Sequence, residues 1–191
     1  MTINAITHML LEIDKLKSVE RKTYVNQGAR LENSAEHSWH LAMAAWLIAE
    51  HYQLDVCYAT LLKMALVHDL GEIDGGDTFL YADEREQAPE RERQCVARLT
   101  REHAPLLDQV QKLWEKQETG NGPEVKLLKV VDRLLPFMLN IATEGRAWRE
   151  HGIKRSQVEF AHAFIAEDMP DIHQWIDARI AEASAEGWLA Q

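Results

Sequence analysis

Residues 56–70 read VCYATLLKMALVHDL, and this is the most hydrophobic stretch of helical length in the chain. Its apolar character is almost unbroken, which predicts a helix that is buried on most sides. We expect Asp55 to cap its N-terminus and Gly71 to end it. An imidazole and a carboxylate, His68 and Asp69, stand next to each other at its end.

The rest of the chain also follows helical spacing, and no segment alternates convincingly with a period of two. Asn33 and Glu36 have the spacing of a capping box, which predicts a helix that runs to about His51. Pro105 and Pro123 stand where prolines open helices. The expected helices are residues 3–16, 34–51, 56–70, 85–103, 105–117, 123–142, 154–168 and 171–187. We expect residues 71–84 to form a loop with at most one short turn, and the fold to be all-α in a single domain.

The composition is that of a folded globular protein. Of the 191 residues, 46% are apolar and 27% are charged. The formal net charge of −10 argues against binding to DNA or RNA polymers, because that affinity comes mostly from Lys and Arg on phosphates. A small phosphorylated substrate needs only local positive charge and stays compatible with this composition.

Two cysteines, Cys57 and Cys95, are too few for a disulfide framework or a thiolate metal cluster. Reduced thiols are typical of cytosolic proteins. The first residues, MTINAITHMLLEIDKLK, lack the basic start and apolar run of a secretion signal. No apolar stretch approaches membrane-spanning length. We therefore expect a cytoplasmic location without membrane association.

Ionisable residues inside apolar helices are the candidates for chemistry. His68 and Asp69 end the most hydrophobic helix, and burying an acid beside an imidazole is costly unless a partner such as a divalent cation compensates. His37 lies early in the second helix, and Asp132 lies in the apolar stretch KLLKVVDRLLPF. Glu72 follows His68 by four residues and Asp69 by three. It would therefore lie on the same side of the helix as these two residues if the helix continues for one more turn. Two imidazoles and two carboxylates suit Mn, Fe, Co, Ni or Zn better than Ca or Mg.

Each of these residues also has a purely structural interpretation. His37 alone fits a surface or core histidine, and Asp132 beside Arg133 and Lys129 fits one half of a salt bridge. The adjacent His68 and Asp69 in an apolar helix are harder to explain this way. We therefore interpret the four residues together as ligands of one ion.

Three blocks of sequence resemble the HD superfamily of metal-dependent phosphohydrolases, and more narrowly its 5′-deoxynucleotidase branch. They are RLENSAEHSWHLAMAA (30–45), MALVHDLGEIDGGDT (64–78) and LWEKQETGNGPEVKLLKVVDRL (113–134). The resemblance covers roughly residues 10–142. It implies an HD-type helical bundle with one domain over residues 1–191, on whose motif-bearing core helices 153–188 pack.

The resemblance also implies roles for particular residues. His37, His68, Asp69 and Asp132 would bind one divalent metal ion, and Glu72 would be the acid-base residue. Members of this branch release phosphate from deoxyribonucleoside 5′-monophosphates, and Asp77 would contact the sugar of such a substrate. Gln117 and Glu118 fall where the family lines its pocket.

An arginine that orients the phosphate in this family corresponds to Arg21 in VERKTYV. Better-known bacterial members place an aromatic residue directly after it. Here Lys22 follows and Tyr24 stands two places further on, so the base or sugar stacking of those members is in question. Lys22 is a further candidate for supplying positive charge to the phosphate, and Arg30 is a weaker one.

Binuclear members of the superfamily have additional histidines between the His-Asp pair and the last aspartate. This chain offers only His103 there, which favours one metal ion. The resemblance further implies a homodimer. Two alternatives stay open: hydrolysis of another nucleotide, such as a triphosphate or a guanosine tetraphosphate, and nucleotide binding by a non-catalytic HD protein.

Overall fold

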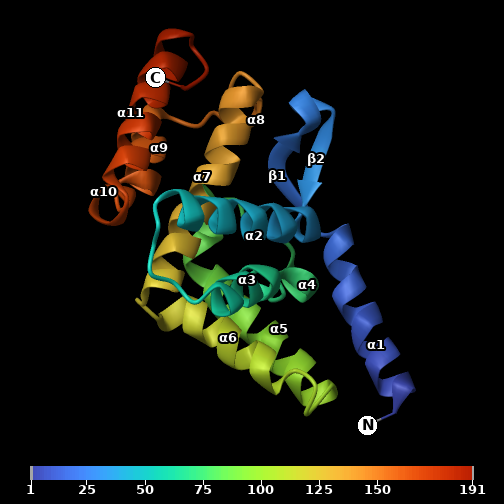
Figure 1. The fold of residues 1–191 in the computed structure, drawn as a ribbon. Coiled ribbons are helices and arrows are strands. Elements are labelled where there is room, and N and C mark those ends of the chain that lie inside the picture. The colour runs from blue at the N-terminus through green and yellow to red at the C-terminus, as the bar shows by residue number, and fades with distance from the viewer. Residues whose placement is uncertain (1, 191) are drawn as a thin grey trace. The chain divides into compact units, whose positions relative to one another are not determined.

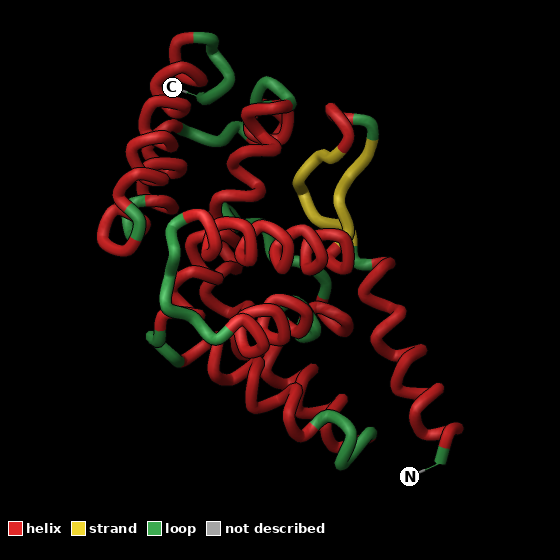
Figure 2. Tube along the Cα trace, viewed as in Figure 1, coloured by secondary structure: helices red, strands yellow, loops and turns green. Residues whose placement is uncertain are grey.

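The structure, a computed structural model, describes residues 2–190, and of Glu84 it describes the backbone alone. The described residues are mostly helical (Figures 1 and 2), which confirms the predicted all-α class. In chain order the elements are α1 (Ile3–Asp14), η1 (Lys15–Ser18), β1 (Glu20–Val25), η2 (Asn26–Gly28), β2 (Arg30–Asn33), α2 (Ser34–His51), α3 (Tyr58–Val67), α4 (Glu72–Gly75), η3 (Asp83–Gln87), α5 (Ala88–Glu102), α6 (Asp108–Thr119), α7 (Pro123–Ala142), α8 (Arg146–His151), α9 (Arg155–His162), α10 (Ile165–Asp168) and α11 (Pro170–Ala185).

The chain forms two compact units, of which the first comprises residues 2–21 and 33–128. In this unit α3 packs against α2 and α6, and α5 packs against α4 and α6. One apolar cluster joins η1, the end of α3, α5 and α6 through Leu16, Val19, Val67, Leu70, Val96 and Trp114. This cluster lies directly beside the residues that follow α3, so it gives them a rigid base.

The second unit comprises residues 22–32 and 129–190 of the described chain. Here α11 packs against α9 and α10. The ring of Phe137 on α7 is the centre of an aromatic group, with ring centroids 5.5 Å from Trp148, 5.1 Å from His162 and 5.9 Å from Trp175. Such tilted and edge-on pairs add to the stabilisation that burial of the rings provides.

The expectation that no strand is present is wrong at residues 20–33. Strands β1 and β2 pair as a two-stranded sheet, drawn in yellow in Figure 2. Side chains on β1 do alternate between buried and exposed, but the buried positions hold Arg21 and Thr23. Hydropathy along β1 therefore does not alternate with a period of two, because the buried residues of this strand are polar.

The predicted capping box is confirmed at the start of α2. The Asn33 side chain accepts a hydrogen bond from Glu36 N at 3.0 Å, and Glu36 Oε2 accepts one from Asn33 N at 3.2 Å. The predicted cap of the next helix is wrong, because α3 begins at Tyr58 and not after Asp55. Instead, Glu124 Oε1 accepts a hydrogen bond from Cys57 N at 2.9 Å, a long-range partner that local sequence does not reveal.

Several predicted boundaries also shift. Helix α3 ends at Val67 and not near Gly71, and α6 begins at Asp108 rather than at Pro105. The helix expected at 154–168 is divided into α9 and α10. The short helix α8 was not expected, and it begins after Gly145, which has a left-handed backbone. Among the described residues, no helix combines the length and the apolar character needed to cross a membrane.

The capping box predicts a measurable share of stability. Asn33→Ala should lower the free energy of unfolding by about 1 kcal/mol, because it leaves a helix donor of α2 without its acceptor. Urea unfolding measures the change. The matched control is Asn121→Ala, at an exposed position between α6 and α7, which should stay within about 0.5 kcal/mol of the unmodified protein. Equal losses in both variants would contradict the capping role.

Candidate metal centre

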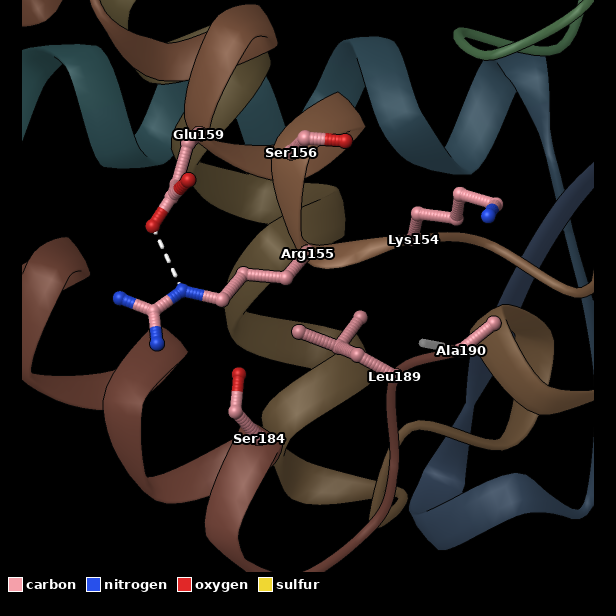
Figure 3. A pocket seen from close by; sticks show the side chains of 7 residues that line it. All are labelled: Lys154, Arg155, Ser156, Glu159, Ser184, Leu189 and Ala190. Carbon is pink, nitrogen blue, oxygen red and sulfur yellow. Dashed lines mark hydrogen bonds and ion pairs between the residues drawn. The ribbon is translucent and has the colours of Figure 1, made fainter.

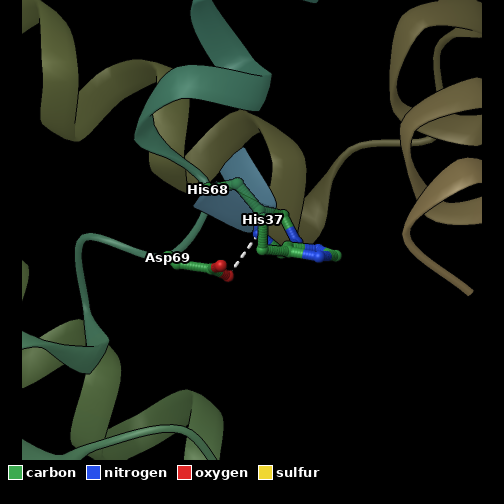
Figure 4. Close-up of side chains that lie close together, drawn as sticks. All are labelled: His37, His68 and Asp69. Carbon is green, nitrogen blue, oxygen red and sulfur yellow. Dashed lines mark ion pairs between the residues drawn. The ribbon is translucent and has the colours of Figure 1, made fainter. Parts of the chain in front are cut away.

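Three of the four predicted metal ligands lie together in the first unit. One ligand atom from each of His37, His68 and Asp69 lies within 4.8 Å of the others (Figure 4). The two imidazole centroids are 5.9 Å apart. His37 is fully buried and Asp69 is 3% exposed. Residues 31 positions apart in sequence thus meet in a site that is largely shielded from solvent.

Helix α2 brings His37 to this place through a narrow inner face. Its buried residues are Ser34, His37, Ser38, Leu41, Ala42, Ala45 and Ala49, which recur at helical spacing. Most of them are small, so the α2 backbone approaches α3 closely. The imidazole in the second turn of α2 therefore reaches the end of α3.

The end of α3 explains how two neighbouring residues reach one point. Side chains of adjacent helical residues point about 100° apart. His68 is the C-cap of α3, and Asp69 already lies in the turn that follows. His68 Nδ1 and Asp69 Oδ1 are in direct contact. The backbone carbonyl of His68 accepts a hydrogen bond from Gln117 Nε2 at 3.1 Å, which fixes this turn to α6.

Arg21 enters the same site from β1 and faces three carboxylates. Its Nη1 lies 3.3 Å from Asp69 Oδ2, 3.3 Å from Asp77 Oδ1 and 3.9 Å from Glu72 Oε1. Arg21 is 9% exposed, so solvent screens these contacts weakly. The structure therefore brings Arg21, Glu72 and Asp77 together with Asp69, one of the predicted ligands.

Burial and charge drive the carboxyl groups of this site apart in pKa. For Asp69, burial acts to raise the pKa, but the neighbouring His68 and Arg21 outweigh it and hold the pKa at about 2. For Glu72, burial and then the negative charge of Asp69 raise the pKa to about 9. Burial also raises the pKa of Asp77, against the pull of Arg21. One carboxyl group is thus kept ionised and its neighbour is kept protonated.

Ser34 is a member of this site that the sequence analysis missed. Its Oγ donates a hydrogen bond to Glu72 Oε2 at 2.6 Å, and the residue is fully buried. The signal in the sequence was weak, since a serine directly after the N-cap Asn33 has an ordinary role in a helix start. The bond orients the Glu72 carboxyl from α2.

Two more features of this region became visible only in the structure. Helix α5 is rich in charge, yet it buries Cys95, Val96 and Leu99, and burial raises the pKa of Glu92 to about 7. Asp74 is exposed to solvent, and it is also bound by Arg98, with Nε–Oδ2 at 2.8 Å and Nη2–Oδ1 at 2.7 Å.

Lys22, Tyr24 and Asp132 belong to the second unit. Lys22 is exposed on β1, on the strand face opposite to that of Arg21. The Tyr24 ring lies under the guanidinium of Arg146 at 3.8 Å, and its hydroxyl donates to Glu150 Oε2 at 2.8 Å. Asp132 is buried on α7, 8% exposed, and accepts a hydrogen bond from Arg133 Nη1 at 2.5 Å. Its ligation of an ion stays a prediction, as do the substrate contacts of Lys22.

The second unit also contains a cavity of about 470 Å³ (Figure 3), none of whose residues the sequence analysis selected. It lies where the start of α9 meets the end of the chain. Arg155 is turned toward Glu159, with Nε–Oε1 at 2.6 Å. The lining residues are Lys154, Arg155, Ser156, Glu159, Ser184, Leu189 and Ala190.

The donor set of the first unit fits a transition metal ion. Two imidazole nitrogens and one carboxylate oxygen are the ligands that Mn, Fe, Co, Ni and Zn accept readily. Asp69 stays ionised, as a ligand must. The three residues could therefore hold one divalent ion and leave coordination positions for a further ligand and for water.

Comparison with known proteins places the chain in a family. A sequence model of the HD domain matches residues 13–173, so the chain belongs to the HD-domain family. This family implies a divalent metal ion. A 5′-deoxynucleotidase HDDC2 of Danio rerio is 32% identical over 130 residues, which are 64% of this chain and 61% of that protein. The protein of the same name in Dictyostelium discoideum is 30% identical over 129 residues, 62% of this chain and 67% of that protein. The chain thus spans about three fifths of the length of the Danio rerio relative.

Solved structures share the fold. A crystal structure from Magnetospirillum magnetotacticum MS-1, described as a predicted metal-dependent phosphohydrolase, is 35% identical. It superposes with a TM-score of 0.89 over 99% of this chain and 96% of that chain. An HD-domain phosphohydrolase of Listeria innocua has a TM-score of 0.64 at 18% identity, over 96% of this chain and 92% of that chain. The second similarity shows the fold alone.

The raised pKa of Glu72 predicts a pH-dependent stability of the metal-free protein. The folded state holds this proton up to about pH 9, whereas the unfolded chain releases it near pH 4.5. The stabilisation is therefore complete below pH 4.5 and is lost as the pH rises to about 9, by at most about 1.4 kcal/mol per pH unit. Glu72→Gln should remove this share of the decline.

Urea unfolding of chelator-treated protein at pH 6 and pH 9 measures the effect, since the window between about 4.5 and 9 contains both values. The matched control is Glu86→Gln, at an exposed position in η3, which should decline like the unmodified protein. A Glu72→Gln protein that loses stability as steeply as the unmodified protein would show that Glu72 ionises normally.

Proposed function

We propose that this chain is a metal-dependent phosphohydrolase that releases phosphate from (deoxy)nucleoside 5′-monophosphates. The observation that carries the proposal is the buried cluster of His37, His68 and Asp69, with Arg21 and a protonated Glu72 beside it. The name of the two HDDC2 relatives supports the substrate class. The description of the Magnetospirillum magnetotacticum structure supports the reaction class.

One divalent ion, which is Mn, Co, Fe, Ni or Zn, would be held by His37, His68 and Asp69, and we propose Asp132 as its fourth ligand. Asp132 is a buried carboxylate, and a carboxylate oxygen is a ligand that these ions accept beside imidazole nitrogens. The chemistry that such an ion supplies when bound is Lewis acidity, which lowers the pKa of water and offsets negative charge at phosphate.

Arg21 would bind the phosphate of the substrate. Its guanidinium offers several N–H donors in one plane, which suits two phosphate oxygens at once. The carboxylates of Asp69 and Asp77, at 3.3 Å each, keep the guanidinium in place before a substrate arrives. The positive charge of Arg21 then offsets part of the charge that phosphate brings into a buried acidic site.

Glu72 would move the proton. In its protonated form the Glu72 carboxyl can donate a proton to the sugar oxygen that leaves the phosphorus atom. In its ionised form it can orient the attacking water. Ser34 holds the carboxyl in one orientation through its 2.6 Å hydrogen bond. Asp77 would accept a hydrogen bond from the 3′-hydroxyl of the sugar, and Lys22 would add positive charge.

The assembly and the location belong to the proposal too. We propose a homodimer in the cytoplasm. Exposed apolar side chains on α2, Trp39, Trp46 and Leu47, support the dimer because such groups are often covered by a partner. Cys57 and Cys95 as free thiols support the location. Light scattering of the purified chain tests the first of these statements.

A phosphate-release assay tests the reaction. Deoxyribonucleoside and ribonucleoside monophosphates, nucleoside triphosphates and guanosine tetraphosphate are each incubated with chelator-treated protein, to which Mn, Co, Fe, Ni or Zn is returned separately. Inorganic phosphate released from monophosphates alone supports the proposal. Pyrophosphate or triphosphate released from the larger nucleotides would replace it with the alternative hydrolase, and binding without turnover of any nucleotide would replace it with a sensor.

Two variants separate chemistry from metal binding. Glu72→Ala should lower the turnover number by roughly a hundredfold to ten-thousandfold while the metal content stays the same, because Glu72 moves a proton and binds no ion. Asp69→Ala should lose both the metal and the activity, because it removes a ligand. Elemental analysis and phosphate release measure the two quantities. Normal turnover of Glu72→Ala would remove Glu72 from the mechanism.

A further variant tests the fourth ligand. Asp132→Asn keeps the size of the side chain but removes the negative charge, so metal affinity should fall by roughly tenfold or more. Competition with a metal indicator dye measures the affinity. The matched control is Asp171→Asn, at an exposed position in α11, which should bind metal normally. Unchanged affinity in Asp132→Asn would leave the ion with three protein ligands.

A further inference from the structure

The segment that carries Glu72 and Asp77 has open space around its two central glycines. We call residues 72–82 the acidic loop; it consists of α4 and the chain that leads to η3. Its centre is Gly75 and Gly76, and a Cβ added at either of them would meet nothing within 4 Å. Gly76 also has a φ of +78°, which side chains other than that of glycine disfavour. Around these two glycines no neighbouring atom limits the path of the chain, so side-chain contacts on either side of them contribute to fixing the loop.

Arg98 on α5 makes the strongest of these contacts. It binds both carboxylate oxygens of Asp74, with Nε–Oδ2 at 2.8 Å and Nη2–Oδ1 at 2.7 Å. Its Nη1 donates to Glu102 Oε2 at 2.8 Å and reaches Glu12 Oε2 on α1 at 3.4 Å. One guanidinium thus joins the acidic loop to two helices. Planar two-point binding of this kind is specific to arginine.

Two more arginines hold the loop at its other end. Arg85 Nη1 donates to the backbone oxygen of Thr78 at 2.7 Å, and Arg91 Nη2 donates to Thr78 Oγ1 at 3.1 Å. Arg91 and Arg98 are seven residues apart on α5, so they share one face of this helix. Asp77 lies between the two attachment points, directly before Thr78 and three residues after Asp74.

We propose that Arg85, Arg91 and Arg98 form an arginine clamp that fixes the acidic loop and thereby sets the position of Asp77 opposite Arg21. Within this clamp, Arg98 is a positioning residue that acts through Asp74. The clamp explains why a loop with two unsupported glycines still holds Asp77 Oδ1 at 3.3 Å from Arg21. Its effect on catalysis rests on the proposed function, whereas its effect on the loop does not.

Hydrogen exchange of the metal-free, full-length protein tests the clamp without any substrate. In Asp74→Asn and Arg98→Gln, backbone amides of residues 72–82 should exchange roughly tenfold faster, because the loop opens more often. The matched control is Glu102→Gln, which removes another partner of Arg98 that lies outside the loop. It should leave the exchange of the loop unchanged.

The charge and the geometry of Arg98 are separated by Arg98→Lys. This variant keeps the positive charge but loses the two-point contact, so the loop should exchange nearly as fast as in Arg98→Gln. Should Arg98→Gln fail to fold, the test rests on Asp74→Asn, whose side chain is partly exposed. Loop exchange that is the same in Asp74→Asn as in the unmodified protein, or that is equally fast in Glu102→Gln, overturns the clamp.

Steady-state kinetics extend the test to the active site. In Asp74→Asn the KM for a nucleoside monophosphate should rise roughly fivefold or more with a smaller change in kcat, because Asp77 is displaced. Metal content should stay the same, since His37, His68 and Asp69 lie outside the loop. An unchanged KM beside fast loop exchange would refute the role of the clamp in substrate binding. Absence of activity in all forms would refute the proposed function and leave the exchange result valid.

Discussion

The ionised carboxylate of Asp69 is the constraint on which the rest of the site depends. A buried carboxylate is unfavourable unless positive charge or hydrogen-bond donors surround it. Here His68 and Arg21 supply that environment and hold the pKa of Asp69 at about 2. The same negative charge contributes, after burial, to the pKa of about 9 of Glu72. One cluster of charges thus keeps one carboxyl group ionised and its neighbour protonated.

This arrangement requires a turn that is fixed on several sides. Gln117 binds the carbonyl of His68 from α6, and Arg98 binds Asp74 from α5. Between them, Gly71 allows α5 to approach closely, because a Cβ at this position would lie 2.5 Å from Glu92 Cβ and 2.9 Å from Glu92 Cα. The apolar cluster that includes Val67, Leu70 and Trp114 packs against the turn that follows α3. His68 and Asp69, which follow the end of α3, and Glu72, which begins the short helix α4, are therefore attached to longer, rigid helices.

The N-terminal hairpin shows where pattern analysis failed and why. It delivers Arg21 to the site, yet its strands were not predicted. In an ordinary strand the buried positions are apolar, and their alternation reveals the strand. On β1 the buried positions are Arg21 and Thr23, which are polar, so burial alternates along the strand while hydropathy does not. Arg21 is buried against the carboxyl groups of Asp69, Asp77 and Glu72 and not in an apolar core.

The cap of α3 and the role of Asp74 were missed for a related reason. The partners are Glu124 and Arg98, which lie 67 and 24 residues away, and local sequence contains no information about them. Local signals did succeed where both partners are close in sequence, as in the capping box of Asn33 and Glu36. Glu92 lies in the charge-rich sequence of α5, which gives no sign that this residue packs against Gly71 and is partly buried.

The sequence by itself determined the helical class, most of the helices and the choice of His37, His68 and Asp69, because these depend on apolar periodicity and on ionisable residues placed within it. Only the tertiary structure decided that Arg21, Ser34, Glu72 and Asp77 surround Asp69, and which carboxyl group keeps its proton. Periodicity is a local property of the chain. Burial and electrostatic interaction depend on distances between segments that only folding brings together.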